Sequence, residues 1–230
     1  MTETFYQAAT LIIPLVLAIV FHEVAHGWVA NLLGDSTAKD LNRLSLNPIR
    51  HVDPVGTVVL PGMLALAGAP VFGWAKPVPV NKWRLRNPRT GMMAVAAAGP
   101  LTNLVLALIG AVVLGLLVRP YLDGQEGSEA VGFIAENLKN FMLINIFLAL
   151  FNMLPIPPFD GSHIVEGLLP PRLAASYDRL RPLGFPIVFL LLIVIPWLLP
   201  QFRIIDWIVV PPVTWLSEHY LALTRWIALF

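Results

Sequence analysis

One long apolar segment constrains this chain more than any other feature, because titratable side chains stand in its middle. The run from Leu11 to Leu33 carries one formal charge, Glu23, which lies between His22 and His26 in the sequence His-Glu-Val-Ala-His. About 20 apolar residues are enough to cross a bilayer as a helix. Charged groups at membrane depth cost roughly 2.5–3.5 kcal/mol on insertion scales, so this segment predicts a functional site within a membrane helix.

The composition places the whole chain in the membrane class. Hydrophobic residues make up 57% of it and charged residues 13%, whereas soluble domains carry about 25% charged residues. The net charge of +1, with no basic stretch interleaved with aromatic residues, excludes nucleic-acid binding. Cysteine is absent, so a metal site would have to use nitrogen and oxygen ligands.

Six apolar stretches predict an all-α polytopic membrane protein with about four to six transmembrane helices. Four of them are predicted to be membrane helices: Tyr6–Leu33, Gly91–Val118, Phe141–Phe159 and Leu183–Pro200. Val55–Trp74 is interrupted by proline and glycine, and we expect a re-entrant or broken segment there. Ile204–Phe230 contains charged residues and two prolines, so it either spans the membrane or lies partly in the interface.

Two further features complete the predicted architecture. In Lys76–Asn81 proline alternates with valine, which favours a short, membrane-associated β element in the form of an edge strand. No internal repeat or flexible linker divides the chain. We therefore expect one membrane-embedded domain over residues 1–230, with a core at 6–161 and additional C-terminal membrane helices at 183–230.

The distribution of basic residues predicts the orientation. Five basic residues and no acidic residue lie between Trp74 and Gly91, and three arginines follow Gly161, whereas the connection after Val118 is mainly acidic. The positive-inside rule places the two basic loops in the cytoplasm. With a re-entrant segment at 55–74, His26 and Asp160 then approach the same, cytoplasmic side. A prokaryotic cytoplasmic membrane fits this compact chain best, and an organelle membrane stays open.

The histidine pair has the spacing of a zinc site. Residues four apart lie on one face of a helix, so His22 and His26 can reach one zinc ion, with Glu23 beside them as a candidate base for a metal-activated water. A catalytic zinc usually has three protein ligands and one open position. Asp160 is a candidate third ligand because it follows a proline-rich break in an apolar helix, where irregular backbone lines a cavity or is buried. His51, His163 and Glu166 compete for that role.

Three motifs in this order resemble the site-2 protease family of intramembrane zinc metalloproteases. His22–His26 is similar to the HExxH element of the family, Gly99–Asn103 to its GxxxN element, and Asn152–Gly161 to its NxxPxPxLDG element. Phe159 stands where the family pattern has leucine, which exchanges one apolar side chain for another. No stretch is long enough for the PDZ or CBS domains of many members, so the resemblance implies a minimal form.

The resemblance also implies the chemistry. The protein would be a zinc endopeptidase that hydrolyses a peptide bond within or near a transmembrane segment of another membrane protein, with one zinc ion per chain. The implied zinc ligands are His22, His26 and Asp160; the implied general base is Glu23; Asn103 and Asn152 would be polar groups near the substrate.

Other interpretations remain open at the level of the sequence. The histidines could form a polar contact between helices, Asp160 could cap a helix, and both asparagines could serve helix packing. The chain could be a metal or proton transporter, an inactive protease-like scaffold, or a different metalloprotease that takes Glu166 as a ligand. The lack of related halves speaks against a transporter, and the presence of Glu23 speaks against a scaffold. The sequence determines neither the substrate nor the oligomeric state.

Overall fold

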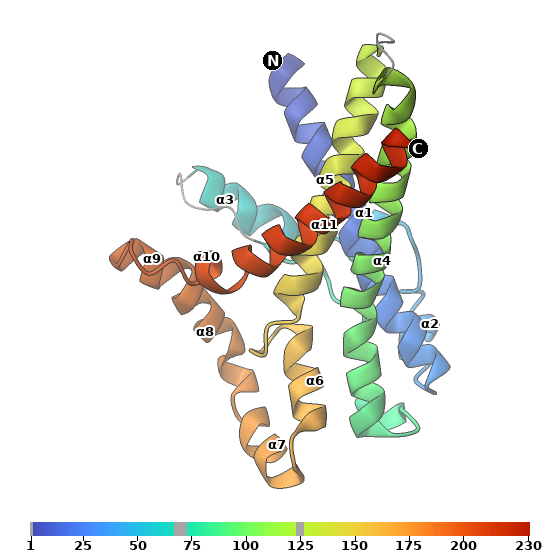
Figure 1. Cartoon of the computed structure of the whole chain (residues 1–230). Coiled ribbons are helices and arrows are strands. Elements are labelled where there is room, and N and C mark those ends of the chain that lie inside the picture. The colour runs from blue at the N-terminus through green and yellow to red at the C-terminus, as the bar shows by residue number, and fades with distance from the viewer. Residues whose placement is uncertain (1, 67–72, 123–126) are drawn as a thin grey trace. The chain divides into compact units, whose positions relative to one another are not determined.

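The computed structural model describes residues 2–66, 73–122 and 127–230, and this part of the chain is helical with no β-strand (Figure 1). Its α-helices are α1 (Thr2–Leu32), α2 (Thr37–Asp40), α3 (Leu60–Leu66), α4 (Pro88–Leu122), α5 (Glu129–Asn152), α6 (Asp160–Leu168), α7 (Pro171–Asp178), α8 (Gly184–Phe189), α9 (Ile195–Leu198), α10 (Ile204–Ile208) and α11 (Val210–Leu229). Short 3₁₀ turns lie at Pro48–His51, Lys82–Arg84 and Arg181–Leu183, and π-helical turns at Pro54–Val59 and Leu190–Val194.

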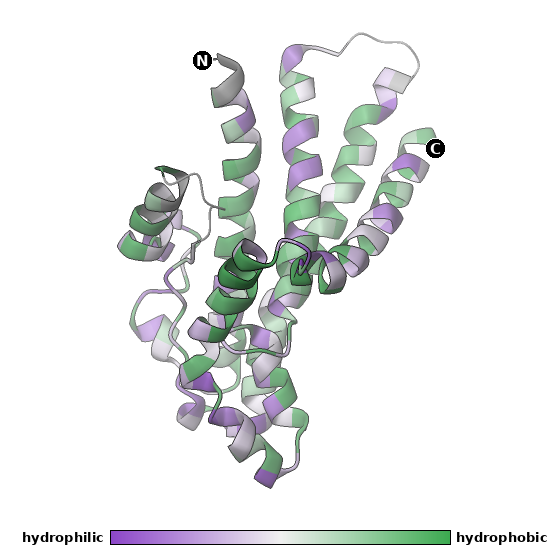
Figure 2. Ribbon diagram, turned by 90° about the vertical axis from the view of Figure 1, so that its left-hand side faces the viewer, coloured by the Kyte–Doolittle hydropathy of each residue, from purple (hydrophilic) through white to green (hydrophobic). Residues whose placement is uncertain are grey.

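Four helical segments in the described residues are long and apolar enough to cross a membrane: Phe5–Leu32, Pro88–Tyr121, Glu129–Asn152 and Pro171–Leu198. They confirm a multi-pass, helical membrane protein, and the helix that begins at the N-terminus is hydrophobic along most of its length (Figure 2). The third helix differs from its predicted limits of Phe141–Phe159. It begins at Glu129, in a polar stretch that lowers the local hydropathy, and it ends before the first proline of the 155–158 segment.

Contacts between Cα atoms divide the chain into two compact units. The first contains the chain up to Ala18, Pro100–Asn152 and Ile204–Phe230, and the second contains Ile19–Gly99 and Met153–Arg203. In the first unit, α4, α5 and α11 pack around a fully buried cluster: Ala107, Ala111, Met142 and Ile146. The predicted C-terminal segment Ile204–Phe230 forms α10 and α11, which are not among the four candidate spans. Our expectation of one domain over 1–230 stays a prediction.

The second unit is built around Ala30, Leu85 and Val95, which come from α1, the loop before α4, and α4 itself. Within this unit the predicted β element at Lys76–Asn81 is not supported, because residues 75–81 form neither a strand nor a bridge. Their backbone N–H groups bond to other partners: Val78 N donates to Glu23 Oε2 and Asn81 N donates to Asp35 Oδ2. Alternating prolines favour an extended backbone, but a strand also needs a second backbone to pair with.

The predicted re-entrant stretch Val55–Trp74 contains residues 67–72, which lie outside the described part. Its described portion consists of the π-helical turn at Pro54–Val59 and α3. Trp74 N donates a hydrogen bond to Gly56 O at 3.0 Å, and the Thr57 hydroxyl donates to Trp74 O at 2.9 Å. The two ends of the stretch are therefore joined, and the chain returns to its starting point.

Candidate metal centre

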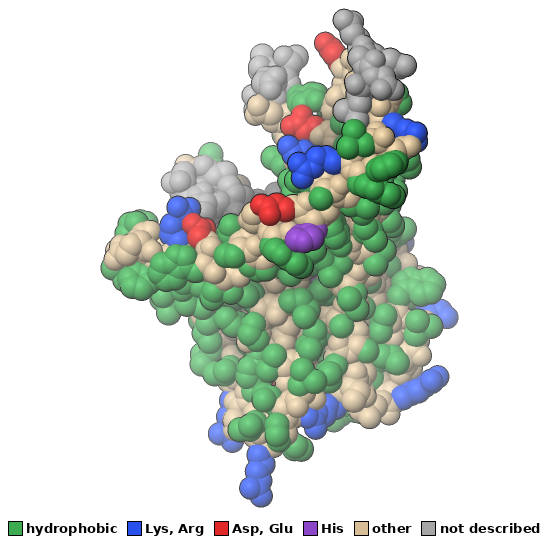
Figure 3. Space-filling view, viewed as in Figure 1, with side chains coloured by type: hydrophobic (Ala, Val, Ile, Leu, Met, Phe, Trp, Pro, Cys, Tyr) green, Lys and Arg blue, Asp and Glu red, His purple; other side chains and the backbone are tan. Residues whose placement is uncertain are grey.

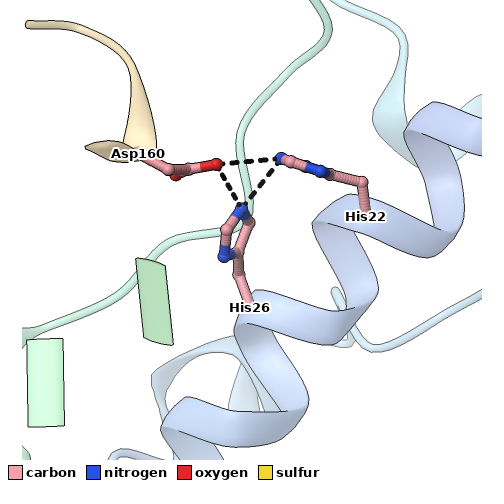
Figure 4. A group of neighbouring side chains, drawn as sticks. All are labelled: His22, His26 and Asp160. Atoms are coloured by element: carbon pink, nitrogen blue, oxygen red, sulfur yellow. Dashed lines mark hydrogen bonds and ion pairs between the residues drawn. The ribbon is translucent and has the colours of Figure 1, made fainter. Parts of the chain in front are cut away.

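Two helices of the second unit bring three metal-binding side chains together. His22 and His26 lie one turn apart on α1, and Asp160 is the first residue of α6 (Figure 4). Their ligand atoms all lie within 4.8 Å of one another. Among the described residues this is the one group of three or more histidine and carboxylate side chains that could hold a metal ion.

The distances within this group fit a zinc ion. His22 Nε2 and His26 Nε2 are 3.0 Å apart, and Asp160 Oδ2 lies 3.2 Å and 3.4 Å from them. Ligand atoms about 2.0–2.1 Å from a tetrahedral zinc ion are about 3.3–3.4 Å from one another. Asp160 Oδ2 is buried and makes no hydrogen bond of good geometry to any described residue, although both imidazoles are within ion-pair distance. Three atoms that can each donate an electron pair thus converge on one point.

The protonation states also suit metal binding. His26 Nδ1 lies 2.7 Å from Val95 O, and since a carbonyl oxygen can only accept, Nδ1 is the donor of this bond and Nε2 is the ring nitrogen that faces the group. Burial raises the pKa of the Asp160 carboxyl, but the His22 and His26 imidazoles, which lie within ion-pair distance, outweigh burial and hold that pKa below its usual range. A carboxylate must be deprotonated to bind a metal ion, and the lowered pKa of Asp160 favours that form.

A close approach of α4 encloses the two imidazoles. His22 and His26 are buried, with 7% and 8% exposure. A Cβ atom built on Gly99 would lie 2.5 Å from His22 Cε1 and 2.5 Å from His26 Nε2. Only glycine leaves room for both rings at this point of α4. Gly99 therefore has a direct packing function at the candidate metal centre.

Glu23 is held by the irregular segment 75–81. Its Oε2 atom accepts a hydrogen bond of 2.7 Å from Val78 N. Val78 stands between Pro77 and Pro79, so it supplies the only backbone N–H of that triplet. The Val78 side chain is buried, and its Cγ1 atom fills the space that a Cβ on Gly27 would need, at 2.8 Å. The candidate base is thus attached to a buried, packed point of the chain.

The competing ligands lie in other networks. His51 is buried and donates from Nε2 to Ser45 O at 2.7 Å. His163 Nε2 accepts a hydrogen bond of 3.0 Å from Arg181 Nη1, and Glu166 forms an ion pair with the same arginine. Burial, together with the charge of Arg181, lowers the pKa of His163 to about 4. None of these three groups belongs to the candidate metal group formed by the described residues.

The two asparagines lie in the first unit. Asn103 is fully buried on α4, where its Nδ2 donates to Ala18 O at 3.2 Å and to Asn145 Oδ1 at 2.7 Å. Asn152 Nδ2 donates to Leu148 O, one turn earlier on α5. The contacts of Asn103 thus connect α4 with α1 and α5, and the contact of Asn152 lies within α5. A substrate-binding role for Asn103 and Asn152 stays a prediction.

Three contributors to the centre were not assigned from the sequence. Val95 and Val78 act through backbone atoms, which leave no signal in the residue type. Gly99 carried a signal, its place in the GxxxN element, but the space it leaves for the imidazoles is visible only in the folded chain.

Comparisons with known proteins identify the family of the chain. Residues 122–195, which include Asp160, match the model of peptidase family M50. YwhC of Bacillus subtilis is 43% identical over 190 residues, which cover 81% of this chain and 80% of that protein. Rip2 of Mycolicibacterium smegmatis is 28% identical over 177 residues, covering 77% of this chain and 64% of Rip2. Both relatives carry the name "Putative zinc metalloprotease". No solved structure matches the chain.

The match to YwhC is long as well as close, and four helical segments in the described part of this chain are long and apolar enough to cross a membrane. The cofactor of these relatives is zinc by name, and the convergent group in this chain has the ligand types and spacing that zinc requires. The chain belongs to peptidase family M50, the site-2 protease family of membrane-embedded zinc metalloproteases.

Proposed function

We propose that His22, His26 and Asp160 hold the zinc ion of this metalloprotease and that Glu23 is its general base. One observation carries the proposal: three buried ligand atoms from two helices lie within 3.4 Å of one another, and the carboxylate oxygen among them has no hydrogen bond of good geometry. The reaction is hydrolysis of a peptide bond within or near a transmembrane segment of another membrane protein.

The protein side chains have separate tasks in this reaction. When bound, zinc lowers the pKa of a coordinated water and polarises the carbonyl group of the substrate. Glu23 accepts the proton of the attacking water and returns it to the leaving nitrogen. The Val78 N–H holds Glu23 Oε2 in one orientation, and the bond from His26 Nδ1 to Val95 O keeps His26 Nε2 directed at the metal.

The substrate must be locally unwound. A membrane helix satisfies its own carbonyl groups with internal hydrogen bonds, so a scissile bond becomes accessible only where those bonds open. Asn103 and Asn152 are the proposed contacts for the unwound strand. Asn103→Ala should lower cleavage and leave the zinc content intact. Asn145→Ala removes the same interhelical hydrogen bond, so equal losses in both variants would assign Asn103 a packing role instead.

The positions of the basic residues and of segment 55–74 support a placement in the cell membrane with the metal centre toward the cytoplasm. Lys and Arg side chains gather at the end of the second unit where α6 meets α7 and α4 begins (Figure 3). The hydrogen bond between Trp74 and Gly56 supports a re-entrant segment, which keeps both ends of 55–74 on one side. Under the positive-inside rule this basic end faces the cytoplasm. The proposal treats residues 1–230 as one functional domain.

The decisive experiment measures metal and cleavage in the same preparations. The detergent-purified chain should contain one zinc ion and should cleave a reporter with a transmembrane segment. Glu23→Gln should retain zinc while cleavage falls by roughly 10²–10⁴-fold, the usual contribution of a general base. Asp160→Ala should lose zinc.

His163→Ala is the matched control, because it changes a histidine of the same helix that is not in the ligand group. It should keep the zinc ion. Loss of zinc with His163→Ala but not with Asp160→Ala would overturn the ligand assignment. Full cleavage by Glu23→Gln would exclude Glu23 as the base, and zinc binding without any cleavage in the wild type would favour a scaffold or a transporter.

A further inference from the structure

A cavity lies against α6, and none of the three proposed zinc ligands lines it. The cavity, of about 300 Å³, is formed by the 3₁₀ turn at Lys82–Arg84, the start of α4, the later turns of α6 and the start of α7. Residues of each element line it, including Lys82, Trp83, Arg89, Glu166 and Pro171. All of these elements belong to the second unit. The cavity takes no part in the proposed hydrolysis.

The position of the cavity along the helices places it at the membrane interface. The candidate spans Pro88–Tyr121 and Pro171–Leu198 begin at Pro88 and Pro171, and both prolines line the cavity. Trp83, on its rim, is 77% exposed. Exposed tryptophans with neighbouring basic residues are typical of the headgroup level of a bilayer. The cavity thus opens where two membrane helices leave the apolar core.

The charge of the cavity wall is positive. Glu166, its acidic residue, is already neutralised by an ion pair with Arg181. His163 also lines the cavity, and burial together with Arg181 lowers its pKa to about 4, so it is uncharged at neutral pH. Lys82 and Arg89 remain, and neither forms an ion pair with a carboxylate in the described part of the chain. Two positive charges therefore face the cavity without an acidic partner.

The two cations are held in place differently. Lys82 Nζ lies 5.3 Å from the centre of the Trp83 ring. Arg89 donates from Nε to Gly167 O at 2.9 Å and from Nη2 to Leu169 O, so its guanidinium group is fixed against the C-terminal end of α6. A preorganised arginine with a lysine nearby suits a phosphate group, to which both residue types bind.

We propose that this cavity binds the phosphate of an anionic phospholipid headgroup, with Lys82 and Arg89 as its cationic contacts. The apolar part of the wall, which includes Met92 and Ala174, would contact the glycerol backbone. The occupant is a lipid because the cavity lies at headgroup level between the ends of two membrane spans. Each lysine or arginine near the membrane surface raises the affinity for anionic lipids by roughly fivefold.

The test uses the full chain in detergent and measures lipid binding by native mass spectrometry. Phosphatidylglycerol should bind more tightly than phosphatidylcholine. Lys82→Gln should lower the affinity for phosphatidylglycerol by about fivefold, and the Lys82→Gln/Arg89→Gln pair by about 25-fold. Arg119→Gln, at the other end of α4, is the matched control and should change the affinity by less than about twofold.

Several results would overturn the proposal. Equal affinity for the two lipids, or an equal loss in Arg119→Gln, would mean that binding reflects general charge or detergent exchange. Saturation of the site by inorganic phosphate alone, with no preference for the lipid, would make it a free-phosphate site. If Arg89→Gln does not fold because the contacts to α6 are lost, Lys82→Gln still decides the matter, since the contact described for the Lys82 ammonium group is with the neighbouring Trp83 ring and not with α6.

Discussion

Replacing Gly99 by alanine would put a methyl group against both imidazole rings of the metal centre. The added Cβ would lie 2.5 Å from His22 Cε1, 2.5 Å from His26 Nε2 and 2.6 Å from His26 Cε1. Carbon atoms in favourable contact are about 3.5–4.0 Å apart, so each ring would have to move by roughly 1 Å. Ligand distances in a metal site tolerate only about ±0.2 Å. The rings cannot yield by this amount and keep their positions as the proposed zinc ligands.

The cost of such overpacking is typically about 1–3 kcal/mol. If the rings move, the overpacking lowers the free energy of zinc binding and leaves the packing of the helices unchanged. Zinc affinity should then fall by roughly 5- to 150-fold, because each 1.4 kcal/mol is a factor of ten in binding. Cleavage at limiting zinc should fall in parallel, while far-ultraviolet circular dichroism should be unchanged.

Competition with a chromophoric zinc chelator measures this affinity directly. Gly132→Ala is the control, since it makes the same change in a membrane helix at a glycine with no neighbouring atom within 4 Å of the added Cβ, and it should bind zinc normally. Wild-type zinc affinity and cleavage in Gly99→Ala would refute the reasoning, because they would mean that the rings do not occupy the positions seen here when zinc is bound.

Three further changes should have distinct effects. Val78→Pro removes the N–H that donates a hydrogen bond to Glu23, so kcat should fall by about 10- to 100-fold at unchanged zinc content, as expected for a lost hydrogen bond to a charged group. Val78→Ala keeps this N–H and should retain most activity. Equal losses in both variants would assign the effect to packing. Burial raises the pKa of the Asp35 carboxyl, but its hydrogen bonds hold that pKa below the ordinary 3.8. Its contribution to stability is therefore complete above that value and is lost as the pH falls through the lower, folded pKa, so Asp35→Asn should weaken the acid dependence of Tm. Gly161→Ala would place Cβ 2.2 Å from Met153 O, a backbone atom, so both zinc binding and Tm should fall; a normal Tm would show that the start of α6 can shift.

Features that depend on local composition were predictable. Apolar runs of sufficient length identify membrane helices because each backbone group in lipid must find its hydrogen bond within the helix. The limits were less predictable: the helix predicted at Phe141–Phe159 begins twelve residues earlier, at Glu129, because helix formation continues through a polar stretch that hydropathy does not count. The resemblance to the site-2 proteases, based on three short motifs, is confirmed by the long match to YwhC.

Features that depend on a distant partner were not predictable with the same certainty. The β element expected at Lys76–Asn81 is absent from the described chain. Lys76 N donates to His51 O, and the N–H groups of Val78 and Asn81 donate to the carboxylates of Glu23 and Asp35 instead of a second strand. The proline pattern correctly indicated a non-helical backbone. The pattern contains no information about which distant groups will accept the hydrogen bonds of its N–H groups.

By itself the sequence determined the membrane class, the nitrogen and oxygen character of any metal site, and the pairing of His22 with His26, since residues four apart on a helix share a face wherever that helix lies. It left Asp160, His163, Glu166 and His51 as alternatives for the third position. Only the tertiary structure decided which carboxylate faces the pair, because that choice depends on the packing of α6 beside α1 and not on any local rule. The same holds for the space at Gly99, which exists only where two helices meet.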